Sequence, residues 1–174
     1  MDMTGEERIA ASRAAVWAAL NDVAVLKQCI PGCESLEKTS DTDMAARVTL
    51  QVGPVRAAFT GKVTLSDIDP PNGYRISGEG QGGVAGYAKG GAVVRLVDDG
   101  AGTLLKYEAK ADVGGKLAQL GGRLIDSTAK KLAGEFFQKF GEIVGGGAGG
   151  AAPSSSLVRK EGWFRRLWRR LFGR

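Results

Sequence analysis

Between residues 35 and 113 the apolar residues recur at every second position, which is the spacing of a half-buried β-strand. Turn sequences rich in Asp, Asn, Pro and Gly separate these runs. The alternation predicts seven strands, over residues 3–11, 35–39, 44–52, 55–68, 74–80, 92–97 and 103–113, with a glycine-rich bend at 82–91. Because short turns join neighbouring runs, we expect one antiparallel sheet.

Helical spacing appears on both sides of this region. Ser12 and Asp22 are good N-caps for two short helices that precede residue 29. From residue 116 to about residue 144, leucines and phenylalanines recur at three- and four-residue steps, which predicts one long helix. The apolar face of the sheet needs a covering layer, and this helix can provide it. The sequence therefore predicts an α+β domain over residues 1–144, in which a curved antiparallel sheet wraps around the long helix.

The last thirty residues follow a different pattern. Residues 145–156, GGGAGGAAPSSS, have the composition of a flexible linker, with a predicted r.m.s. span of about 20 Å. Residues 157–174 predict an amphipathic helix with six large apolar residues on one side and four arginines on the other. The expected membrane contacts are Trp163, Phe164, Arg165, Arg166, Leu167, Trp168, Arg169, Arg170, Leu171 and Phe172. Their repeat would be about 15 Å long against a bilayer core of about 30 Å, so such a helix lies on a membrane without crossing it.

The positive charge of the chain is concentrated in this tail. The net charge is +5, and residues 157–174 hold seven Lys and Arg against one Glu, which leaves about −1 for residues 1–156. The body therefore lacks the basic surface that nucleic-acid binding requires, and no nucleic-acid partner is expected. The first residues, MDMTGEERIAAS, do not resemble a secretory signal, so we expect a cytoplasmic protein.

The residue types of common catalytic and metal sites are scarce. Histidine is absent, and two cysteines, Cys29 and Cys33, do not complete a four-ligand zinc site. We expect both to be reduced thiols, with a redox or cross-chain role as the alternative. The glycine-rich residues 78–91 lack the GKS or GKT ending of a phosphate-binding loop. The residues thus predict no catalytic group and no metal site.

Three segments carry a family resemblance. VWAALNDVAVLKQCIPGCESLEK at 16–38, VGPVRAAFTGKVTLSDIDPP at 52–71 and YRISGEGQGGVAGYAKGGAVVRL at 74–96 resemble the CoxG family of carbon monoxide dehydrogenase subunits. The element order is that of the helix-grip fold of the START-like (SRPBCC) superfamily. The resemblance implies an accessory protein of a molybdenum hydroxylase of the carbon monoxide dehydrogenase type, which helps to place that enzyme at the inner face of the cytoplasmic membrane. The family has no agreed catalytic residues, so the resemblance implies none here.

Small residues on the predicted inner face of the sheet point to an internal cavity. They leave either close helix packing or an enclosed apolar space, and helix-grip proteins commonly keep the space. The expected lining residues are Phe59, Gly61, Val63, Ile76, Gly78, Val94, Leu96, Tyr107, Ala109, Leu117, Leu120, Leu124 and Phe136. No covalent cofactor is expected. A lipid or an isoprenoid quinone is the expected ligand, because an enzyme of this type must pass electrons to a membrane acceptor. Gly121 and Gly122 either allow bending near an opening or fit against the sheet.

Other interpretations remain open at this point. The tail can bind a protein partner instead of a membrane, because its exposed aromatic residues need some cover. A cyclase- or hydrolase-like enzyme acting on an apolar substrate would bring Tyr87, Tyr107 or Glu135 together in a pocket. A scaffold without any ligand would have a closed core.

Overall fold

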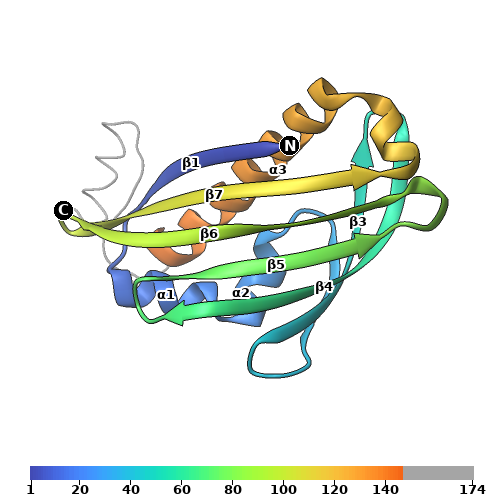
Figure 1. The fold of residues 1–174 in the computed structure, drawn as a ribbon. Coiled ribbons are helices and arrows are strands. Elements are labelled where there is room, and N and C mark those ends of the chain that lie inside the picture. The colour runs from blue at the N-terminus through green and yellow to red at the C-terminus, as the bar shows by residue number, and fades with distance from the viewer. Residues whose placement is uncertain (147–174) are drawn as a thin grey trace.

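The computed structural model describes residues 1–146, in which one antiparallel sheet curves around a long helix (Figure 1). Its strands are β1 Asp2–Ile9, β2 Cys33–Lys38, β3 Asp43–Val52, β4 Val55–Asp69, β5 Gly73–Gln81, β6 Tyr87–Asp99 and β7 Gly102–Gly114. The α-helices are α1 Arg13–Leu20, α2 Val23–Cys29 and α3 Gly122–Gly141. Two short 3-10 helices, η1 Gly83–Ala85 and η2 Gly115–Leu120, and a final π-helix, η3 Glu142–Gly146, complete the fold. The expected α+β helix-grip architecture is confirmed.

The sheet order is β1-β7-β6-β5-β4-β3-β2, so the first strand lies beside the last one. Every other neighbouring pair is consecutive in the chain, as expected for strands joined by short turns. Helices α1 and α2 fill the connection from β1 at one edge of the sheet to β2 at the other edge. The chain thus returns to its starting edge before α3 begins.

The short helices form where the sequence supplies caps. The Ser12 hydroxyl accepts a hydrogen bond from the Ala15 amide at 3.1 Å, and the Asp22 carboxylate accepts one from the Ala24 amide at 2.9 Å. The hydroxyl of Thr103, which is buried on β7, donates to the Ala11 carbonyl at 2.7 Å. The Thr103 bond ties the turn from β1 into α1 to the last strand.

Two predicted boundaries were wrong. The glycine-rich bend is confined to Gly82–Gly86, and β6 begins at Tyr87 instead of residue 92, because the glycines from 90 onward pair in register with β5 and β7. The long helix is broken at Gly121, whose φ of +92° is a conformation that glycine adopts readily, so η2 and α3 replace one continuous helix. A Cβ at Gly121 or Gly122 would meet nothing within 4 Å, so the pair does not fit closely against the sheet.

The closely packed core occupies the end of the sheet that α1, α2 and the C-terminal part of α3 cover. Val16, Leu105 and Phe140 are at most 1% exposed there. The rings of Phe136 and Phe140 stack at a centroid distance of 5.7 Å. Tyr74 is also buried in this core, and burial raises its pKa to about 12. By contrast, the apolar residues near the start of α3 are only half-buried, so the sheet and the helix are not closely packed at that end.

Candidate functional site

A cavity of about 550 Å³ separates the sheet from the N-terminal half of α3. Aliphatic side chains of β3 form one wall, and apolar residues of α3 and η2 form the roof. The side chains that provide these surfaces are Ala46, Val48, Leu50 and Val52 from β3, Ile125, Ala129 and Leu132 from α3, Leu117 from η2, and Ile30 and Pro31 after α2. A space of this size and lining suits an apolar ligand with few polar groups.

Glycine backbone forms part of the floor of the cavity. Gly61 on β4 pairs with Gly80 on β5, and Gly78 on β5 pairs with Gly90 on β6. Without side chains at these positions the inner face of the sheet is hollowed, and the space above it stays open. A Cβ at Gly80 would have ordinary contacts, the nearest being Phe59 Cβ at 3.9 Å. At Gly90, however, a Cβ would lie 2.0 Å from the Lys110 carbonyl oxygen, so the close approach of β7 requires glycine there.

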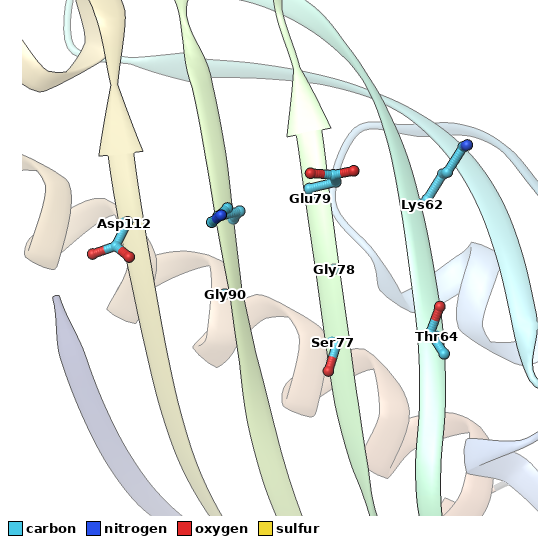
Figure 2. A pocket seen from close by; sticks show the side chains of 8 residues that line it. Lys62, Thr64, Ser77, Gly78, Glu79, Gly90 and Asp112 are labelled. Atoms are coloured by element: carbon cyan, nitrogen blue, oxygen red, sulfur yellow. The ribbon is translucent and has the colours of Figure 1, made fainter.

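Charged side chains lie on the other face of the same strands. Figure 2 shows Lys62, Glu79 and Asp112 around a shallow polar depression on the outside of the sheet, with α3 behind it. Lys62 and Glu79 are register partners, and Lys89 lies between Glu79 and Asp112 in the register. Because side chains alternate between the faces of a strand, residues 62, 79 and 89 border the cavity with their backbone while their charged groups point outward. The charges therefore do not make the cavity polar.

Six of the residues expected at a ligand site line this cavity. They are Phe59, Gly61, Val63, Ile76, Gly78 and Leu117. That any of them contacts a ligand stays a prediction.

The other seven lie outside the cavity wall. Val94 and Leu96 are in the closely packed core, where Phe136 also packs. Tyr107 stacks on Phe137 at a centroid distance of 5.5 Å, and Ala109 faces Met3 on β1. Leu120 and Leu124 are half-exposed near the break between η2 and α3. The three phenylalanines of α3 pack in or against the core and do not line the cavity.

Sequence reasoning missed the contribution of β3. Ala46, Val48, Leu50 and Val52 alternate with polar residues, which was a usable signal for an inward face. The helix residues expected to line the cavity were chosen on the assumption of one continuous helix from residue 116. The break at Gly121 changes which faces of residues 117–132 point toward the sheet, and Ile125, Ala129 and Leu132 line the cavity.

The residues of an enzymatic alternative are not brought together. Tyr87 is 44% exposed beside Gly114, Glu135 is exposed on α3, and Tyr107 packs on Phe137. None of the three lines the cavity. Within residues 1–146 no group of three metal-ligating side chains gathers.

One carboxylate does lie on the inner face, outside the cavity. Glu7 on β1 is half-buried opposite Leu105, and burial raises its pKa. Its charge acts on Tyr107, where burial first and then Glu7 raise the pKa of the phenol.

Both cysteines are free thiols, Cys29 at the end of α2 and Cys33 at the start of β2. Cys29 is buried, and the half-buried Cys33 lies with its sulfur 3.4 Å from the Ser35 carbonyl oxygen. Burial raises the pKa of each thiol, so both are held in the protonated, less reactive form near neutral pH.

The expected membrane-binding residues 163–172, and all but the first two residues of the expected linker, lie outside the described residues. In the part of the chain that is described, no helix combines the length and the apolar character needed to span a bilayer.

The family model of the carbon monoxide dehydrogenase CoxG subunit matches residues 5–145. This chain belongs to the CoxG family. The match includes α3 and all seven strands except the first residues of β1. Nearly all the residues that line the cavity therefore lie within the matched region. No match was found among curated proteins.

Solved structures support the family's fold. A conserved protein from Geobacillus kaustophilus is 30% identical, with a TM-score of 0.79 over 83% of this chain and 95% of that one. A START superfamily protein from Mycobacterium smegmatis is 14% identical, with a TM-score of 0.61 over 82% and 96% of the two chains. The Zhui aromatase/cyclase from Streptomyces is 13% identical, with a TM-score of 0.57 over 83% and 93%. The last two likenesses are of fold alone.

Proposed function

We propose that this protein is a non-enzymatic accessory subunit of a carbon monoxide dehydrogenase type molybdenum hydroxylase, and that its cavity carries a long apolar molecule. Family membership supports the partner. The single observation that supports the carrier role is the cavity of about 550 Å³, walled by aliphatic side chains and floored by glycine backbone. An isoprenoid quinone is the first ligand to test, since it is apolar, long and able to accept electrons.

Extraction of the purified full chain into organic solvent, followed by mass spectrometry, tests the carrier role. We expect an apolar compound at a near-stoichiometric ratio. Ala129→Phe places a ring in the cavity roof and should reduce the bound amount strongly, whereas Lys130→Phe, on the exposed side of the same helix turn, should not. A protein that extracts empty, or equal loading of both variants, argues for the ligand-free scaffold.

The second part of the proposal concerns location: the tail holds the protein and its partner enzyme on the inner face of the cytoplasmic membrane. The support is the sequence, whose six large apolar residues would fall on one half of a helix and whose four arginines would fall on the other half. An anionic surface would attract each arginine by about 1 kcal/mol in addition to the apolar burial.

Co-sedimentation with anionic liposomes compares the full chain with a chain ending at Ser156. We expect the full chain to pellet with the liposomes and the shortened chain to pellet far less. Equal pelleting of the two chains would show that the tail does not mediate membrane binding. Added salt should weaken the binding of the full chain, because charges at a surface are screened.

A further inference from the structure

Val84 is the most exposed large apolar residue in the described chain, with 93% of its surface accessible. It lies at the tip of η1, in the connection from β5 to β6 (Figure 1). This connection is a turn closed by backbone hydrogen bonds. The Ala85 amide donates to the Gly82 carbonyl at 3.2 Å, the Gly82 amide donates to the Gly86 carbonyl at 2.8 Å, and Ala85 itself is buried. The turn thus buries the side chain of Ala85 and leaves that of Val84 exposed.

The turn belongs to a larger surface at this end of the sheet, which we call the loop-end surface: residues 52–56, 82–87 and 114–123. Residues 82–87 and 114–123 are in contact, and residues 52–56 adjoin them through side chains just outside the surface. A Cβ at Gly53 would touch the Leu124 side chain just beyond it, one at Gly82 would touch the Phe59 ring, and one at Gly86 would touch the Gly114 carbonyl. Besides Val84, the half-exposed Leu120 and Val55 and the exposed Pro54 add apolar surface.

The charges of the loop-end surface have one sign. It contains three basic residues, Arg56, Lys116 and Arg123, all exposed, and neither aspartate nor glutamate. The remainder of residues 1–156 has excess acidic charge, so this surface is an exception within the body. Exposed aliphatic side chains among basic ones, without carboxylates, are complementary to an anionic lipid surface.

The cavity reaches this same end of the molecule. Val52 and Leu117 line the cavity and belong to the loop-end surface. Contact with a bilayer here would therefore bring a cavity wall to the lipid. The chain length also allows it: eleven residue steps from Gly146 to Leu157 span at most about 40 Å, and α3 is about 30 Å long.

We propose that the loop-end surface is a second membrane-contact site, which docks Val84 and the flanking basic residues on an anionic bilayer so that the cavity faces the lipid. This proposal rests on the proposed carrier function and adds the orientation of the body. A protein partner or a second copy of the chain on the same surface would be alternative occupants.

The test attaches an environment-sensitive NBD fluorophore to one introduced cysteine in the full chain. The background is Cys33→Ser, in which the remaining native thiol, Cys29, is buried at 2% exposure. Val84→Cys reports the loop-end surface. Val97→Cys is the matched control, since Val97 is also exposed, at 44%, but lies near the opposite end of β6. Ten residues of strand separate the start of β6 from Val97, about 33 Å. The membrane is represented by vesicles of phosphatidylcholine with about one-third phosphatidylglycerol.

On addition of vesicles we expect the emission of the fluorophore at residue 84 to increase and shift to the blue, and that at residue 97 to stay unchanged. In unlabelled full chain, Val84→Asp should weaken vesicle binding about tenfold, because an aspartate loses the apolar contact and is repelled by anionic head groups. Val97→Asp should leave the binding unchanged. Val84 is fully exposed, so the thermal midpoint of Val84→Asp should equal that of the unchanged chain.

Full-chain binding with no change at residue 84 would overturn this proposal and leave the tail anchor and the carrier role standing. A blue shift at residue 84 without vesicles that grows with protein concentration would also overturn it, in favour of a second copy. Absence of any vesicle binding by the full chain would overturn both this proposal and the tail anchor, whereas the extraction experiment tests the carrier role separately.

Discussion

At the scale of single residues, the half-buried carboxylate of Glu7 lies in an unfavourable environment for a charge. A carboxylate on the inner face of β1 is half-buried beside Tyr107, and burial raises its pKa above the usual value near 4.5. In the unfolded chain the same group ionises at lower pH. The folded state therefore binds the proton more tightly, and Glu7 costs stability as the pH rises through its folded pKa.

The glutamine variant tests this directly. The free energy of unfolding of Glu7→Gln, minus that of the unchanged protein, should increase from pH 4 to pH 7, measured by urea titration at each pH. Glu34→Gln should show the opposite slope, because hydrogen bonds from Thr49 and Arg47 lower the pKa of Glu34. A flat difference curve for Glu7→Gln would show that its carboxylate is fully solvated.

The glycines of the cavity floor make a second prediction at this scale. Gly90→Ala should destabilise the protein by roughly 1–3 kcal/mol, because its Cβ would lie 2.0 Å from the Lys110 carbonyl oxygen and β7 must shift. Gly80→Ala, on the neighbouring strand, meets only ordinary contacts and should change the thermal midpoint little. Equal effects of the two substitutions would contradict the close approach of β6 and β7.

At the scale of elements, the break between η2 and α3 decides the shape of the cavity roof. Gly121 has a positive φ, whereas Gly134 lies on the exposed side of α3. An added Cβ meets nothing within 4 Å at either position, so the two sites differ in backbone conformation alone.

Alanine substitutions at the two glycines should therefore have opposite signs. Gly134→Ala should stabilise the protein by about 1 kcal/mol, because alanine loses less backbone freedom in a helix. Gly121→Ala should destabilise it, since alanine disfavours a φ of +92°. Chemical denaturation measures both, and stabilisation by Gly121→Ala would mean that the helix can continue through this point.

The same break shows how far the sequence could predict this molecule. The two-residue period gave the seven strands, because one face of each is buried and the other is wet. The three- and four-residue period could not locate the end of η2, since both a 3-10 turn and an α-helix place residues three apart on one side. The start of β6 was predicted too late because of its glycines. A residue without a side chain does not contribute to an alternating pattern, so a glycine-rich strand and a glycine-rich bend have similar sequences.

The candidate site was predictable in kind but not in extent. Gly61, Gly78 and Phe59 follow from alternation on β4 and β5, and all three line the cavity. Phe136, Phe137 and Phe140 pack in or against the core and do not line the cavity, and that division depends on packing between distant segments. The periodicity of the sequence does not indicate where along the helix the cavity ends.

At the scale of the whole molecule, the closely packed core and the cavity lie toward opposite ends of the sheet. The closely packed core lies under α1, α2 and the end of α3, whereas the start of α3 spans the apolar cavity. Methyl groups report the two ends separately: Val48, Leu50 and Leu132 line the cavity, whereas Leu36 and Leu105 are buried in the core.

The most direct test of the carrier account is a titration of the full chain, freed of bound lipid, with a short-chain menaquinone, followed by methyl NMR. The account predicts saturable shifts at the methyl groups of Val48, Leu50 and Leu132, with Leu36 and Leu105 unmoved. Absence of saturable shifts at the cavity methyls, or shifts of equal size in the core, would contradict it.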